Sequence, residues 1–139
     1  MTAHPTLLGP IAALALVTGM VWLTMVITRT SALRRGIASM RYYRAYTASV
    51  PPEWVERPAR AFANLFEVPV LFYLVCLLML QTGTGDSTQL ALAWLFVAAR
   101  AAQAAIHIII NRIQYRFAAY AVGCATVIAL WVRFLVMRS

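Results

Sequence analysis

The apolar positions of the sequence form four long runs, separated by three more polar connections. The runs cover residues 7–27, 61–81, 88–111 and 117–137. Each run can cross a bilayer, because about 20 helical residues span the ~30 Å hydrocarbon core. Backbone polar groups inside lipid must be satisfied within their own segment, so the runs are expected to be helices. The pattern predicts an all-α protein with a single domain over residues 1–139, an integral membrane four-helix bundle with up-and-down topology.

The connections indicate which helices are neighbours. Residues 82–87 contain mostly turn-forming residues, so the second and third helices are expected to be antiparallel neighbours. The third connection is equally short, whereas the first is long and contains Pro51 and Pro52, which end any helix that continues from the first run. Pro69 lies inside the second run and leaves the carbonyl of Leu65 without a donor. We therefore expect a kink beside Glu67.

Composition supports lipid as the main solvent of this chain. Hydrophobic residues make up 63% of the sequence and charged residues only 12%, against ~25% charged residues in soluble domains. The net charge is +8 and every basic residue other than histidine is arginine. These arginines flank the apolar runs, so they favour a role in membrane topology and no nucleic-acid partner is expected. Abundant alanine and the use of arginine alone indicate a GC-rich bacterial genome.

The arginines also predict the orientation. Loop one and loop three carry nine of them, at positions 29, 34, 35, 41, 44, 57, 60, 112 and 116. The positive-inside rule places these loops in the cytoplasm and both termini on the non-cytoplasmic side. Arg133 and Arg138 oppose this assignment but are outnumbered. In a bacterium the chain would be a multi-pass protein of the inner membrane.

Polar residues recur inside two of the runs at helical spacing. The second run and its approach carry Arg57, Arg60, Asn64 and Glu67, and the third run carries Arg100, Gln103, His107 and Asn111. Each set lies on one face of a helix. An ionisable residue near the bilayer centre costs about 2.5–3.5 kcal/mol, so these faces should meet protein or water and not lipid. We expect the two stripes to face each other, with an ion pair between Glu67 and Arg100.

Two interpretations of these stripes are open. In the structural one, the polar groups satisfy each other as hydrogen bonds between helices. In the functional one, they line a pocket that opens to the cytoplasm and binds a zwitterionic, anionic ligand, with arginine for carboxylates, asparagine for an amide and glutamate for an ammonium group. Arg116 and Tyr120 join this pocket from the first turn of the fourth helix. Cys76 and Cys124 each lie alone in an apolar run, so no metal site is predicted.

A basic, aromatic cluster occupies the first connection. It consists of Arg41, Tyr42, Tyr43, Arg44 and Tyr46. Arginines next to a membrane helix are attracted to anionic lipid, and tyrosine is enriched at the membrane interface. The cluster is therefore expected to hold this connection on anionic headgroups.

One segment resembles the signature of a known family. The residues Arg60-Ala-Phe-Ala-Asn64-Leu-Phe-Glu67-Val-Pro69 form an R-x3-N-x2-E-x-P pattern at the start of the second of four membrane helices. This pattern resembles that of the MAPEG family, the membrane-associated proteins in eicosanoid and glutathione metabolism, which include microsomal glutathione S-transferases. The resemblance implies a homotrimer that holds glutathione, as a co-substrate, between neighbouring subunits near the cytoplasmic face.

The resemblance also implies roles for individual residues. Arg60, Asn64 and Glu67 match the residues that hold the ligand, and Arg116 matches the catalytic arginine proposed to stabilise the glutathione thiolate. Tyr120 stands where the prostaglandin-synthase branch carries a tyrosine. Arg100 and His107 complete the predicted ligand-binding set. Glutathione-using members tend to carry tyrosine on the third helix, whereas this chain has Gln103 and His107 there.

Three functions are compatible with these patterns. The first is a glutathione S-transferase or peroxidase that acts on lipophilic electrophiles or hydroperoxides at the cytoplasmic side of the membrane. The second is a non-enzymatic membrane protein of the same fold that binds lipid or a partner, as the departures at Gln103 and His107 indicate. The third is a small proton-coupled exporter, but such pumps usually carry their carboxylate in the first helix, and residues 7–27 contain none.

Overall fold

The computed structural model describes residues 6–138, and every regular element among them is a helix. The six helices are α1 (Leu8–Arg34), α2 (Met40–Ala45), α3 (Glu53–Asn64), α4 (Val68–Thr82), α5 (Ser87–Ile109) and α6 (Ile113–Val136). Four helical spans are long and apolar enough to cross a membrane, namely α1, α3 together with α4, α5, and α6. The predicted all-α, four-helix membrane architecture is confirmed.

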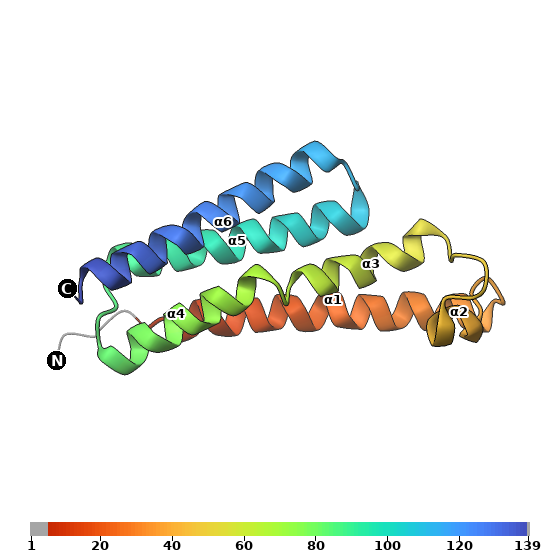
Figure 1. Ribbon diagram of the computed structural model, residues 1–139, viewed down its shortest axis with the longest axis horizontal. Helices are drawn as coiled ribbons and strands as arrows, with labels where there is room; N and C mark the ends of the chain where they lie inside the picture. The colour runs from red at the N-terminus through yellow and green to blue at the C-terminus, as the bar shows by residue number, and fades with distance from the viewer. Residues whose placement is uncertain (1–5, 139) are drawn as a thin grey trace.

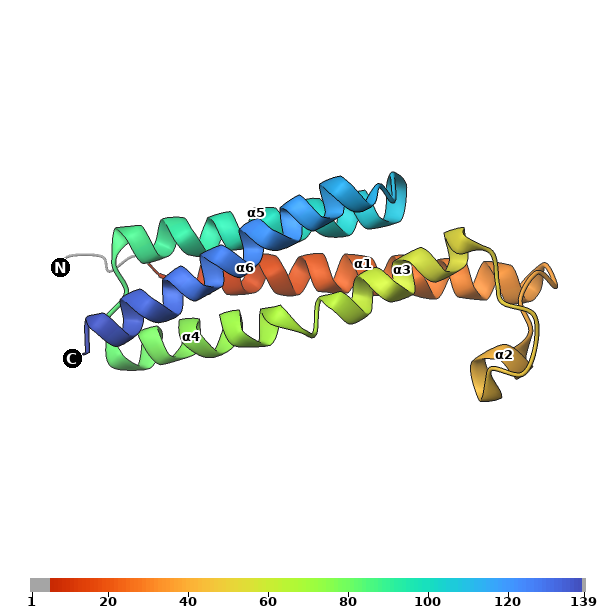
Figure 2. The same ribbon diagram turned by 45° about the horizontal axis from the view of Figure 1, so that its top comes forward.

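The spans run up and down as a bundle of two antiparallel pairs (Figure 1). Helices α5 and α6 form one pair and α1 forms the other with α3, while α4, which continues the second span, packs against α6. The C-terminal end of α6 and the α4–α5 connection lie at one end, whereas the α5–α6 connection faces the other. Helices α1 and α3 continue beyond that connection, and α2 lies across their far tip (Figure 2).

The helices extend beyond the apolar runs at several ends. Helix α1 continues to Arg34 instead of stopping at residue 27, α3 begins at Glu53 instead of residue 61, and α6 begins at Ile113 instead of residue 117. Hydropathy detects only the part of a helix that lies in hydrocarbon. Residues that favour helix can continue it into the headgroup region, so α1 reaches roughly 40 Å against a core of ~30 Å.

The second span is interrupted at the position where a kink was expected. Helix α3 ends at Asn64 and α4 begins at Val68, so the residues 65–67 between them lie outside regular helix. Pro69 occupies the first turn of α4, where a missing N–H is tolerated. The N–H groups of Leu65 and Phe66 bond to carbonyls three residues back and close α3 tightly. The predicted kink is therefore a complete break beside Glu67.

The turn between α4 and α5 is built from local capping contacts. Gly83 ends α4 in the left-handed region at φ +65°. Asp86 caps α5, since its carboxylate accepts from the N–H of Gln89 at 2.7 Å while the Gln89 side chain accepts from the N–H of Asp86 at 2.9 Å. Arg133 on α6 forms a salt bridge with the same carboxylate. The Gln89 N–H, followed by Arg133, lowers the pKa of Asp86 below its ordinary value.

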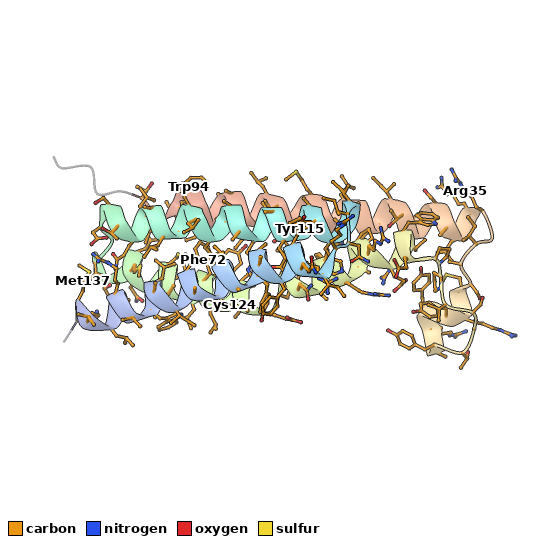
Figure 3. All side chains as sticks on the ribbon, turned by 90° about the horizontal axis from the view of Figure 1, so that it is seen from above. Arg35, Phe72, Trp94, Tyr115, Cys124 and Met137 are labelled. Carbon is orange, nitrogen blue, oxygen red and sulfur yellow. The ribbon has the colours of Figure 1, made fainter. Side chains whose placement is uncertain are left out.

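Apolar side chains fill the bundle and also cover its outside. Phe72 on α4 stacks on Phe96 of α5 at 4.5 Å between ring centroids, in the same buried cluster as Leu14 and Leu130. Large apolar side chains remain exposed along all four spans (Figure 3), among them Leu16, Met20, Leu74, Leu95, Ile128 and Val132. The hydrocarbon of a bilayer is apolar, so these exposed side chains are suited to contact with membrane lipid.

Candidate functional site

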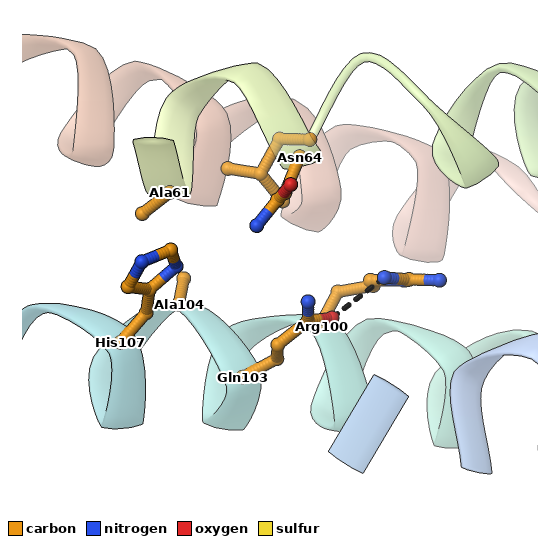
Figure 4. Close-up of a pocket in the computed structure, with 7 residues that line it drawn as sticks. Ala61, Asn64, Arg100, Gln103, Ala104 and His107 are labelled. Atoms are coloured by element: carbon orange, nitrogen blue, oxygen red, sulfur yellow. Dashed lines mark hydrogen bonds between the residues drawn. The ribbon is translucent and has the colours of Figure 1, made fainter. Parts of the chain in front are cut away.

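Two neighbouring hollows lie where α3, α5 and α6 approach each other. The smaller one, the inner hollow, has a volume of only about 10 Å³ and lies between α3 and α5. Figure 4 shows Ala61 and Asn64 of α3 facing side chains of α5 across this gap. Such a volume holds about one water molecule, so the inner hollow belongs to the packing of the subunit. It is lined by Ala61, Asn64, Leu65, Arg100, Gln103, Ala104 and His107.

The larger one, the outer hollow, measures about 250 Å³ and opens at the surface of the bundle. Most of its lining is polar, although it lies between spans that are otherwise apolar outside. Asn64 and Gln103 line both hollows, so these two side chains lie at the boundary between them. The outer hollow is lined by Asn64, Glu67, Gln103, Ile113, Arg116, Phe117 and Tyr120.

Arg100 is buried in the middle of the bundle, with 1% of its surface exposed. Its Nη1 donates to the Gln103 side-chain oxygen at 2.6 Å (Figure 4), and its Nη2 lies 3.9 Å from the sulfur of Cys124. The guanidinium also lies over the rings of Phe96 and Tyr120, at 5.2 and 5.1 Å from their centroids. Cation–π contacts of this kind stabilise a desolvated guanidinium. Arg100 is therefore fixed from both α5 and α6.

The predicted ion pair between Glu67 and Arg100 is wrong for this subunit. Within residues 6–138, the salt bridges join Arg57 to Glu53 and Arg133 to Asp86. Glu67 lies at the break between α3 and α4, where its side chain is exposed and acts on Arg100 only through longer-range electrostatics. Its carboxylate lines the outer hollow, whereas the guanidinium lines the inner one.

Arg116 is held by the connection that precedes its helix. Its Nη1 donates to the side-chain oxygen of Asn111 at 3.2 Å. Asn111 has φ +51°, and its N–H bonds back to the carbonyl of Ile106. Asparagine tolerates this left-handed conformation better than most residues, so one side chain both closes the α5–α6 connection and orients the arginine. Arg116 thus reaches the outer hollow from the first turn of α6.

His107 lies at the end of the inner hollow nearest the α5–α6 connection. It is 2% exposed, and its Nδ1 has no hydrogen-bond partner among the described residues. The charges of Arg57, Arg60 and Arg116 all act on this ring. Arg60 itself is exposed and lines neither hollow. The three guanidinium groups give this end of the bundle a positive field, which favours an anionic ligand.

The structure divides the predicted site residues into three groups. Asn64, Glu67, Arg116 and Tyr120 meet around the outer hollow, Arg100 and His107 line the inner one, and Arg60 lies outside both. Sequence reasoning did not include Gln103, Ile113 and Phe117 among the ligand-binding residues. The position of Gln103 on the polar stripe of the third helix could have identified it as a site residue. Ile113 and Phe117 could not have been identified in this way, because apolar residues are ordinary in and beside a spanning helix.

No curated protein and no solved structure matches the chain. A sequence profile of the MAPEG family matches residues 7–136. This range includes all the residues of both hollows and nearly all of the four spans. The chain is therefore an integral membrane protein that belongs to the MAPEG family.

Proposed function

We propose that the outer hollow binds glutathione and that the chain is a glutathione S-transferase or peroxidase for lipophilic substrates. The observation that carries this proposal is the meeting of Asn64, Glu67 and Arg116 around one hollow of about 250 Å³. Glutathione offers two carboxylates, an ammonium group and peptide amides. A guanidinium, a carboxylate and a side-chain amide are the complementary groups. The chain therefore has the chemical types that this ligand needs.

The proposed ligand would lie between subunits of a homotrimer. Glu67 is exposed and the outer hollow opens at the surface of the subunit, at a depth where lipid would otherwise meet polar groups. A neighbouring subunit would cover this opening and supply the opposite wall. Exposed Arg60 is available to take part from the same face, although it lies outside the hollow of one subunit.

Arg116 is the proposed catalytic residue. The thiolate is the nucleophilic form of glutathione, and a nearby guanidinium favours it over the thiol while keeping its own proton. The thiol proton leaves to water, the sulfur attacks the electrophile, and a carbon–sulfur bond replaces the bond to the leaving group. With a hydroperoxide, sulfur attacks the distal oxygen and the O–O bond breaks, which releases an alkoxide that takes a proton from water and leaves as the alcohol. A second glutathione then converts the sulfenic acid to the disulfide and water.

The orientation and location belong to the same proposal. Both termini would lie on the non-cytoplasmic side of a bacterial inner membrane, so that the α5–α6 connection and the outer hollow face the cytoplasm. Cytoplasmic glutathione would then enter from the water side, while lipophilic substrates would arrive through the bilayer.

Calorimetric titration of the detergent-purified protein with glutathione tests the proposal. Saturable heat and an ultraviolet thiolate absorption are expected. Arg116→Ala should remove the thiolate signal while keeping most of the affinity. Arg112→Ala, which removes an exposed arginine of the same connection that lines neither hollow, is the matched control and should behave as the wild type. Absence of heat with the wild-type protein at millimolar glutathione would exclude glutathione as the ligand.

A second candidate function is a non-enzymatic protein of the same fold that binds lipid or a partner. This chain has Gln103 and His107 on the third membrane helix, where glutathione-using members of the family tend to carry tyrosine. The Gln103 side chain borders the outer hollow but is already hydrogen-bonded to Arg100, and His107 is buried away from that hollow. This wall thus offers glutathione little beyond Gln103. Conjugation of glutathione to a dinitrohalobenzene would count against this function, whereas lipid retained in the hollow after purification would support it.

A further inference from the structure

Helix α2 lies at the tip of α1 and α3, away from both hollows (Figure 2). Ser39 begins it, since its hydroxyl accepts from the N–H of Arg41 at 3.1 Å, and Tyr46 ends it at φ +54°. The Arg29 guanidinium of α1 lies 4.9 Å from the centre of the Tyr43 ring. Three buried apolar side chains also pack together here, namely Ala32 of α1, Ala38 just before α2, and Val55 of α3. One side of α2 is thus held against the bundle.

The other side of α2 and the residues after it remain open. Met40, Tyr46 and Val50 are 68%, 79% and 70% exposed, and Arg41 and Arg44 are exposed between them. Met40, Arg41, Tyr43 and Arg44 line a surface hollow of about 350 Å³. We call this surface the α2 patch. It combines exposed apolar side chains with two guanidinium groups one helical turn apart.

No acidic group neutralises the α2 patch from its own segment. Residues 28–52 contain five arginines and neither aspartate nor glutamate. Glu53, the first acid along the chain, is in a salt bridge with Arg57 at 2.7 Å, and Glu56 is buried. Burial, and after it the charge of Glu56, raises the pKa of Tyr43, so its ring stays neutral. The patch therefore presents net positive charge.

The length of α1 indicates the depth at which the patch lies. Its 27 residues cover roughly 40 Å, which exceeds the ~30 Å hydrocarbon core by about the thickness of the headgroup layers. A patch at the tip of α1 thus lies at headgroup level. Phosphates at that level meet arginine, and exposed methionine, tyrosine and valine can meet the upper part of the acyl chains.

We propose that the α2 patch binds the headgroup phosphate of an anionic phospholipid, held between Arg41 and Arg44. Met40 and Tyr46 lie against the adjoining acyl region. The lipid belongs to the leaflet from which α1 emerges. This site is separate from the outer hollow and does not depend on glutathione binding.

Native mass spectrometry of the purified full chain in mixed micelles tests the proposal, with equal amounts of phosphatidylglycerol and phosphatidylcholine. The wild-type protein should retain phosphatidylglycerol preferentially. Removal of one arginine near a membrane surface weakens binding on the order of five-fold, so Arg41→Gln with Arg44→Gln should lose most of this preference. The matched control, Arg112→Gln with Arg138→Gln, removes the same charge from exposed positions outside the patch and should keep the preference.

A charge-preserving variant and a competing anion complete the experiment. Arg41→Lys with Arg44→Lys keeps the charge and should keep the preference. Inorganic phosphate at the concentration of the lipid should not displace it. The proposal is overturned if the double glutamine variant retains phosphatidylglycerol as well as the wild type, if its control loses as much, or if free phosphate displaces the lipid. Equal melting temperatures of all variants, expected because the substituted side chains are exposed, show that the loss of lipid is not a loss of folding.

Discussion

Gly123 on α6 faces the buried guanidinium of Arg100 on α5, so that a Cβ atom at Gly123 would lie 3.1 Å from Arg100 Nε. The arginine cannot easily move, because Gln103 and the rings of Phe96 and Tyr120 surround it. Gly123→Ala should therefore destabilise the protein. Overpacking costs about 1–3 kcal/mol, whereas alanine gains about 1 kcal/mol of helix propensity, so we expect a net loss of about 1 kcal/mol.

Gly19 on α1 provides the matched control for this substitution. A Cβ atom there would meet nothing within 4 Å, and the residue is exposed. Gly19→Ala should leave the melting temperature in detergent unchanged or raise it slightly, while Gly123→Ala lowers it. Equal melting temperatures of the two variants would show that Arg100 has room to shift.

Pro69→Ala tests the break between α3 and α4. Alanine would restore an N–H that can donate to the carbonyl of Leu65, and so would favour continuous helix through Glu67. Since Glu67 lines the outer hollow from this break, we expect weaker glutathione binding with little loss of thermal stability. Titration calorimetry and thermal melting measure the two effects.

Pro58→Ala is the comparison for this experiment. Pro58 lies inside α3, which is continuous around it, so its replacement should not redirect the chain. Binding by the Pro58 variant should stay as in the wild type. If both variants bind glutathione equally well, the break is not needed to present Glu67.

Two substitutions separate the roles of Asn111. Asn111→Gly keeps the left-handed conformation but removes the acceptor for Arg116, so it should retain stability and weaken the thiolate absorption of bound glutathione. Asn111→Ala loses the acceptor and also strains the backbone, at a cost of roughly 1–2 kcal/mol. The alanine variant should thus melt at a lower temperature than the glycine variant. The opposite order of melting temperatures would contradict this role of the backbone.

The capping carboxylate of Asp86 should make the protein less stable in acid. The Gln89 N–H and Arg133 lower the pKa of Asp86 in the folded state. The ionised carboxylate therefore contributes its full share to the free energy of unfolding above the unfolded-state pKa of ~3.9, and this share is lost as the pH falls through the folded-state pKa. Asp86→Ala removes the helix cap and should cost about 0.5–2 kcal/mol at neutral pH. Asp86→Asn keeps an acceptor for the N–H and should lose less. Melting curves should show the wild type approaching the asparagine variant as the pH decreases; a constant difference would exclude a charge effect.

The second span shows how far sequence could predict this structure. Its apolar length indicated a membrane helix, and Pro69 indicated where that helix departs from regular geometry. The predicted partner of Glu67 was wrong because the stripe argument assumed an unbroken helix across Asn64 and Glu67. Residues 65–67 lie outside regular helix, so the 3.6-residue periodicity does not carry across them.

Arg100 shows a different limit of sequence reasoning. Its polar stripe correctly identified residues that avoid lipid, but it did not distinguish a partner on another helix from one on the same helix. Gln103, three residues further along α5, accepts a hydrogen bond from Arg100, and aromatic rings of α5 and α6 make cation–π contacts with its guanidinium. Which group accepts the hydrogen bond from Arg100 depends on side-chain rotamers and on the close approach of α6 at Gly123. The spacing of polar residues along one helix determines neither of these.

The interruption of the second span also affects how water reaches the backbone. Peptide groups within a continuous membrane helix are shielded from solvent, whereas those of residues 65–67 lie outside regular helix next to an open, polar hollow. The N–H groups of Leu65 and Phe66 remain hydrogen-bonded, so the effect is expected at Glu67, whose amide should take up deuterium faster than α5 amides at the same depth. This span would then have its most exchangeable hydrogen near its middle, the reverse of an ordinary membrane helix, which frays from its ends.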